Sequence, residues 1–144
     1  MGVLREKNHK GYLRTLHELH FAWGQCQRAF SILTQTWMDN SNNPNISWYV
    51  SLVAKSKLEL EGEYLGRPFS VKLIPKVNGK DCLGQVLVTG VDPVSGDSKL
   101  VFAFCLNLEG DLVSENGDVE TAEDEQLQHF SLLCEMCLRV GEQV

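Results

Sequence analysis

A chain of 144 residues, of which 43% are hydrophobic and 22% charged, has the size and composition of one ordinary globular domain with its own core. The net charge of −6 argues against general nucleic-acid binding, which needs a net basic face. No apolar run approaches the roughly 20 residues of a membrane-spanning helix, so neither nucleic acid nor membrane is expected as a partner.

The N-terminus and the cysteines indicate the compartment. No apolar segment of a secretory signal follows Met1, and Glu6 stands where N-myristoylation prefers Ser or Thr. The five cysteines are odd in number and fall mostly inside apolar patterns, as reduced, buried thiols do in the cytosol. We therefore predict a cytoplasmic protein with a single α+β domain over residues 1–144, in which residues 1–10 form a flexible basic arm.

The first predicted element is one long helix over residues 11–38. Its apolar positions are spaced 4-3-4-3-4-3-4, which places them on one face of a helix about 40 Å long. The Asn- and Ser-rich run before Pro44 favours a turn and ends the helix. The apolar stripe consists of Tyr12, Leu16, Leu19, Trp23, Cys26, Phe30, Leu33 and Trp37.

The opposite face of this helix carries a second set of unusual residues. At 100° per residue, Phe21 and Ile32 lie nearly opposite the stripe. Gly24 lies between them, and a mid-helix glycine costs about 1 kcal/mol relative to alanine, which indicates the close approach of another backbone. The alternative is that Phe21 and Ile32 are simply exposed. The candidate dimer or partner face consists of Phe21, Gly24, Arg28 and Ile32.

After Pro44 the apolar period changes from 3.6 to 2, which indicates strands. Alternation over residues 46–60 predicts one long, half-exposed strand with a bulge or bend near residues 55–56. A second strand is predicted over residues 69–77, where Pro75 indicates an edge or a bulge. The Asn-Gly pair at residues 78–79 is a strong hairpin turn.

The remaining elements complete an antiparallel meander. Residues 82–91 form a third strand, and residues 100–108, apolar on both faces, are expected to form a central strand covered on both sides. A short fifth strand follows at residues 112–114, and the C-terminal helix opens at Thr121. The sequence therefore predicts an α+β fold: a long N-terminal helix, a four- to five-stranded antiparallel meander sheet and a C-terminal helix. The predicted apolar face of the last helix consists of Leu127, Phe130, Cys134, Cys137 and Leu138.

Two motifs have residue types that serve metal or redox chemistry in other proteins. His17 and His20, in the sequence HELH, have i, i+3 spacing instead of the i, i+4 spacing of zinc proteases, and no third or fourth ligand is evident. Cys134 and Cys137 have CxxC spacing but stand near a helix C-terminus, where the helix dipole opposes a thiolate. The sequence also has no phosphate-binding loop and no nucleophile elbow. We therefore predict no catalytic residues, no metal and no cofactor.

These observations favour a non-enzymatic, small acidic cytosolic protein that acts through protein–protein interaction, as a homodimer. The charge is divided: the run from Arg5 to Arg14 is basic, whereas residues 100–138 contain no Lys or Arg and many acids. One alternative is an enzyme of unrecognised type that uses His17 or His20 with a carboxylate. The other is a small-molecule-binding domain with an apolar pocket between the first helix and the curved sheet. That pocket would be lined by Trp23, Phe30, Trp48 and Phe102.

Overall fold

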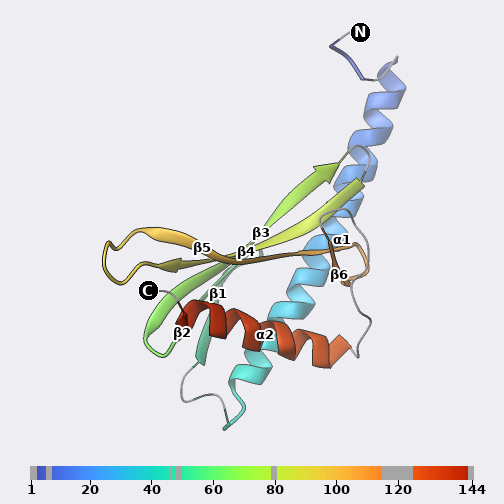
Figure 1. Cartoon of the computed structure of the whole chain (residues 1–144). Helices are drawn as coiled ribbons and strands as arrows, with labels where there is room; N and C mark the ends of the chain where they lie inside the picture. Colours follow the sequence, from blue (N-terminus) through green and yellow to red (C-terminus); the bar gives the residue numbers. More distant parts are fainter. Residues whose placement is uncertain are drawn as a thin grey trace.

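Two helices pack against a curled six-stranded antiparallel sheet in the computed structural model, which describes residues 3–5, 8–45, 47, 50–78, 81–114 and 125–142 (Figure 1). The fold is α+β, as predicted, with the strands in simple sequential order from β1 to β6. The elements are α1 (His9–Ser41), β1 (Val50–Ser56), β2 (Glu59–Tyr64), β3 (Arg67–Asn78), β4 (Asp81–Val91), β5 (Ser98–Leu106), β6 (Leu112–Val113) and α2 (Glu125–Gly141).

Helix α1 begins two residues earlier than predicted because Asn8 caps it. The Asn8 side-chain oxygen Oδ1 accepts a hydrogen bond from the backbone N–H of Gly11 at 2.8 Å, which satisfies one of the free N–H groups of the first turn. The apolar stripe is buried only in its C-terminal half, where Phe30, Leu33 and Trp37 enter the core. Leu16, which the pattern placed on the same stripe, is 63% exposed because the sheet does not extend that far along the helix.

The sheet has six strands instead of four to five because the strand predicted over residues 46–60 is a hairpin. Strands β1 and β2 are joined by a two-residue turn, with Ser56 paired to Glu59. A two-residue turn alone would reverse the alternation of inward and outward side chains, because Ser56 and Glu59 pair on the same face although they are three residues apart. The bulge at Lys55 adds one residue to β1 and restores the phase, so the period-2 pattern continues through the turn and conceals it. The irregularity predicted near residues 55–56 is present as a register shift between Ala54 and Ser56.

Strands β3 and β4 form the longest hairpin, with ten paired positions from Phe69–Gly90 to Asn78–Asp81. Pro75 lies inside β3, but β2 pairs with β3 only as far as Lys72. The backbone N–H of Leu73 donates to the Leu58 carbonyl on the β2 side. Because N–H groups alternate along a strand, the nitrogen of Pro75 points to the same side, where β2 has already ended, and no ladder hydrogen bond is lost. At Pro75, β3 is therefore locally an edge strand, as its sequence predicted.

Strand β5 is not the central, doubly covered strand that its apolar sequence predicted. Strand β6 pairs with only its last two residues, Cys105 and Leu106, so most of β5 has β4 as its single strand neighbour within the described part of the chain. Only residues 104–106 are buried without interruption. The apolar side chains of β5 are accounted for by packing of Phe102 and Phe104 beneath α2 rather than by a second covering layer.

Helix α2 packs against α1 and the sheet, but on a different face from the one predicted. Phe130 is 39% exposed, Leu138 is 52% exposed and Cys134 is also exposed; only Cys137 of the described side chains in the predicted face is buried. The side chain of Leu127 and the predicted helix start at Thr121 lie outside the described residues. The helix is apolar on most sides, so its periodicity did not fix its orientation. The buried apolar face is Leu132, Leu133, Met136, Cys137 and Val140.

Candidate interaction surfaces

One face of α1 combines exposed apolar side chains with cations. This outward face consists of Lys10, Arg14, His17, Phe21, Gly24, Arg28 and Ile32, all of them exposed. Because a helix turns 100° per residue, these positions lie within about 80° of one another, on the side opposite the buried stripe. Phe21 is 60% exposed and Ile32 is 52% exposed. The four residues predicted as an interface belong to this face, and their contact with a second chain stays a prediction.

The N-terminal turns of α1 extend beyond the sheet (Figure 1). Ala22 is the first fully buried residue of the helix, so residues 9–21, about 20 Å of helix, have little cover from the rest of the domain. Leu13 and Leu16 are both more than half exposed there. The helix therefore offers apolar surface on two sides of its projecting end.

The structure describes three of the four residues predicted to line one pocket. Phe30 is 1% exposed and fills the core between α1 and the sheet, beside Leu33 and Trp37. Trp23 is partly buried at the margin of that core. Trp48 lies outside the described residues. Phe102 lines a cavity on the other side of the domain core, beside β5.

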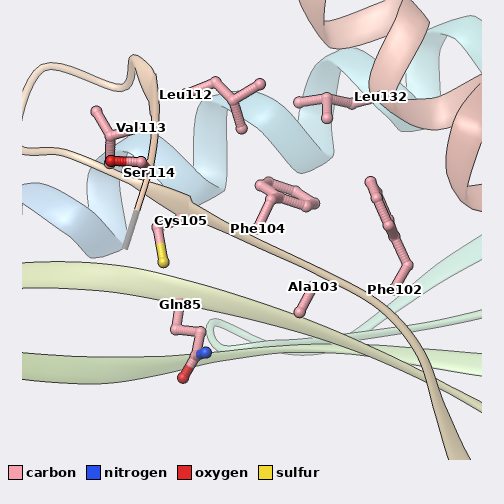
Figure 2. Close-up of a pocket in the computed structure, with 9 residues that line it drawn as sticks. All are labelled: Gln85, Phe102, Ala103, Phe104, Cys105, Leu112, Val113, Ser114 and Leu132. Carbon is pink, nitrogen blue, oxygen red and sulfur yellow. The ribbon is translucent and has the colours of Figure 1, made fainter. Parts of the chain in front are cut away.

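That cavity lies beside the part of β5 that β6 does not cover (Figure 2). Its volume is about 310 Å³, at the lower limit of small-molecule sites. Phe102 and Phe104 project from β5 toward α2 with ring centroids 5.5 Å apart, and the Arg139 guanidinium lies 5.8 Å from the Phe102 centroid. The lining consists of Gln85, Phe102, Ala103, Phe104, Cys105, Leu112, Val113, Ser114 and Leu132.

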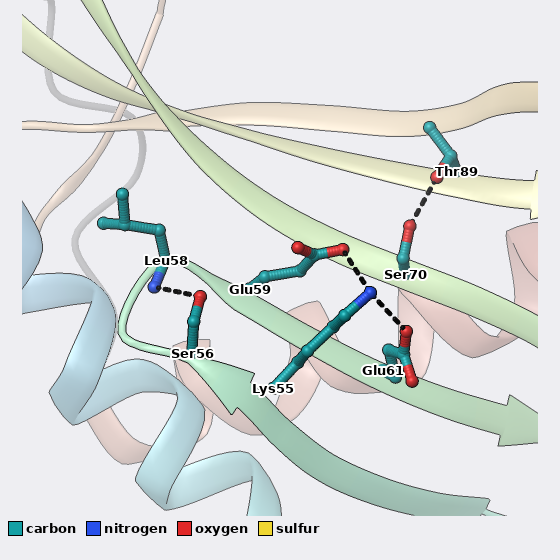
Figure 3. Close-up of polar contacts among 7 residues, drawn as sticks. All are labelled: Lys55, Ser56, Leu58, Glu59, Glu61, Ser70 and Thr89. Carbon is teal, nitrogen blue, oxygen red and sulfur yellow. Dashed lines mark hydrogen bonds and ion pairs between the residues drawn. The ribbon is translucent and has the colours of Figure 1, made fainter.

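The exposed face of the β1–β2 hairpin carries a small charge network (Figure 3). The Lys55 ammonium lies 3.1 Å from the Glu61 carboxylate and 3.9 Å from that of Glu59. These contacts, above all the hydrogen bond to Glu61, raise the pKa of Lys55. Glu63 continues the row of β2 carboxylates on the same face, but in the described part of the chain it has no cationic partner.

The histidine and cysteine motifs lie in different surroundings. His17 and His20 are exposed on α1, and the described residues contain no group of three or more side chains placed to hold a metal ion. Burial, followed by the neighbouring Cys134, raises the pKa of Cys137 to about 12. Burial, followed by the neighbouring Cys82, raises the pKa of Cys26 to about 11. Both buried thiols are therefore protonated at neutral pH and are weak nucleophiles.

One buried polar residue escaped the sequence reasoning. His129 is 4% exposed, and its backbone carbonyl accepts a hydrogen bond from the Trp37 indole Nε1 at 2.7 Å, which ties α2 to α1. The sequence did indicate that His129 is buried, because it precedes Leu133, Met136 and Val140 at the 4-3-4 spacing of one helix face. A histidine is not counted as an apolar position, so this second stripe was overlooked.

Comparison of the chain with protein-family models, with curated proteins and with solved structures gives no match. Neither described helix is long and apolar enough to cross a membrane.

Proposed function

We propose that this chain acts in the cytosol by binding a protein partner on the outward face of α1, that it does so as a homodimer, and that it is not an enzyme. The observation that carries the proposal is the exposure of Phe21 and Ile32 on a helix face whose charged residues between positions 10 and 32, namely Lys10, Arg14 and Arg28, are all cations; exposed Asp39 continues the same face beyond them. Large apolar side chains grouped on one exposed face are typical of a protein interaction site.

The chemistry of the face specifies the kind of partner. The face runs from residue 10 to residue 32, about 33 Å of helix, which matches an elongated partner such as another helix. A side chain at Gly24 would meet nothing within 4 Å, so the glycine leaves a shallow gap where a second backbone can approach closely. Cations flank the apolar side chains, and a partner with acidic residues would complement them. We therefore propose an acidic amphipathic helix as the partner.

Small-molecule binding is the second candidate function, supported by the cavity of about 310 Å³ beside β5. The space between α1 and the sheet gives it less support, because Phe30, Leu33 and Trp37 pack there with at most 1% exposure. A screen of small apolar probes by thermal shift tests it. A probe that raises the melting temperature of the wild type, but not of Leu112→Trp, would support the cavity as its site. Probes that act equally on both proteins would count against it.

A photo-crosslinking experiment tests the partner face. Benzoylphenylalanine is placed at position 21, and at the exposed loop position 94 as a matched control, and the protein is expressed in its native organism. We expect position 21, but not position 94, to label one protein, and mass spectrometry to locate the label in an acidic amphipathic segment. The double exchange Arg14→Glu and Arg28→Glu should abolish this labelling. Equal labelling from both positions, or labelling that survives the exchange, would contradict the proposal.

A further inference from the structure

We propose that His17 and His20 form half of a zinc site, which a second copy of this chain completes by placing its own α1 antiparallel to the first. This inference rests on the proposed function only in requiring a homodimer, for which it supplies the contact. Both histidines are exposed, and no hydrogen bond or ion pair occupies either imidazole within the described part of the chain. Both ring systems are therefore accessible to a metal ion.

The two histidines have a spacing that lets one helix hold a metal ion with two ligands. At positions i and i+3 they lie about 60° apart around α1 and about 4.5 Å apart along it, so both side chains can reach one ion. Imidazole suits zinc, and a structural zinc ion takes four ligands in tetrahedral geometry. Among the described residues of one chain, no group of three or more side chains is placed to hold a metal. The site is therefore incomplete in a single copy.

The histidines belong to an exposed seam of α1 that consists of Leu13, His17, His20 and Gly24. These residues follow one another at 4-3-4 spacing and lie within about 60° of one another around the helix. All four are exposed, including the large apolar side chain of Leu13. A Cβ added at Gly24 would meet nothing within 4 Å. The seam therefore has an uncovered apolar side chain at one end and open space at the other.

This seam is complementary to itself in antiparallel orientation. A two-fold axis midway between His17 and His20 places His17 of one copy opposite His20 of the partner subunit. The same axis places Leu13 opposite Gly24 of the partner subunit, because positions 13 and 24 have the same midpoint. The imidazoles of both copies then surround one point on the axis, and each Leu13 side chain enters the gap at Gly24. A larger residue at position 24 would hold the helices apart, which gives this mid-helix glycine a reason.

The position of the seam allows two domains to pair without collision. Three of its four residues precede Ala22, the first fully buried residue of α1, and lie where the helix extends beyond the sheet (Figure 1). An antiparallel pair therefore holds its two sheets at opposite ends. Phe21, Arg14 and Ile32 lie about 70–90° from the centre of the seam, so they stay accessible to the acidic partner helix.

Charge opposes this pairing in the absence of metal. The two-fold axis brings Lys10 of one copy level with Arg28 of the partner subunit, on the same side of the helix pair. Both cations are exposed and screened by salt, so their repulsion is small. The apolar contact is also small, because Leu13 is the only large apolar residue of the seam. We therefore expect zinc to be required for the dimer.

Sedimentation velocity of the untagged protein tests this metal dependence. We expect a monomer in EDTA and a dimer once zinc is added at one ion for every two chains. His17→Ala and His20→Ala should each abolish the zinc-dependent dimer, whereas the matched control His9→Ala, an exposed histidine of the same helix, should retain it. Cys134→Ser should also retain it, because this exposed thiol lies outside the site. One zinc ion bound by each monomer, or a zinc-dependent dimer that survives His17→Ala, would overturn the site.

The failure of this site and the failure of the proposed function give different results. A dimer that forms in EDTA and survives both seam-histidine variants would overturn the zinc site and leave a homodimer with another contact. A monomer at every zinc concentration would overturn the site and the homodimer together. Neither result changes the crosslinking from position 21, which tests the partner face separately.

Exchanging the side chains at the two ends of the seam tests the register. Gly24→Leu fills the gap that Leu13 of the partner subunit enters, and should raise the dissociation constant of the zinc-bound dimer about tenfold. The double variant Leu13→Ala with Gly24→Leu moves the large side chain from one end to the other and should restore the dimer. Positions 13 and 24 are about 16 Å apart along one helix, too far for rescue within a single chain. An unweakened Gly24→Leu dimer, or a double variant without rescue, would refute the antiparallel register.

Discussion

Two glycine-to-alanine substitutions should change stability in opposite directions, because one glycine lies in open space and the other in a close contact between α1 and the sheet. A Cβ added at Gly24 meets nothing within 4 Å. A Cβ added at Gly84 would lie 2.9 Å from Leu73 Cδ1 and 3.2 Å from Cys26 Cβ. Leu73 and Cys26 are both fully buried, so neither has free space to move into.

The sizes of the two effects follow from these surroundings. Gly24 has helical geometry on an exposed surface, and alanine there should raise the free energy of unfolding by about 0.5–1 kcal/mol. At Gly84 the extra methyl must push α1 away from β4 or force Leu73 from its rotamer. Overpacking of this kind costs about 1–3 kcal/mol. The two variants should therefore differ by about 1.5–4 kcal/mol, although the chemical change is the same.

Urea unfolding monitored by circular dichroism measures both free energies, with the slope m as the check that the folded and unfolded states are otherwise unchanged. A Gly84→Ala variant as stable as the wild type would refute the close approach of Cys26 to β4. A destabilised Gly24→Ala variant would show that position 24 is covered within a single chain. If Gly24→Ala is stabilised but loses the crosslink from position 21, Gly24 serves the partner and not the fold.

Three further predictions concern other contacts. Leu65 has a φ of 53° in the β2–β3 turn, so Leu65→Asn should raise the melting temperature by relieving about 1 kcal/mol of backbone strain. Trp37→Phe removes the donor to the buried His129 carbonyl and should lower the free energy of unfolding by about 1–3 kcal/mol in urea titrations. Because burial raises the pKa of Cys137 from 9.0 to about 12, its contribution to stability is complete below pH 9 and falls as pH rises toward 12. Urea midpoints across this range should therefore fall less steeply for Cys137→Ala than for the wild type; an equally steep fall would remove Cys137 as a cause.

Much of the fold could be read from local patterns. The long helix, its C-terminal end near Pro44 and the β4 strand follow from periodicity and turn residues, and the structure confirms them within a few residues. Prediction failed where a pattern was compatible with two arrangements. The bulge at Lys55 together with the two-residue turn at residues 57–58 preserves strand alternation, and α2 is apolar on most sides, so neither the first hairpin nor the buried face of α2 could be identified.

For the candidate interaction surfaces, too, local patterns predicted one part and tertiary contacts decided the rest. By itself the sequence determined that α1 has two faces, since 3.6-residue periodicity is a property of the helix alone and places Phe21 and Ile32 opposite the core. Only the tertiary structure decided how far the sheet extends along that helix, and so left Leu16 exposed and Phe30 buried on the same stripe. Tertiary pairing likewise decided that β1 ends the sheet. Which strand lies at an edge depends on contacts between distant segments, and no local pattern encodes those contacts.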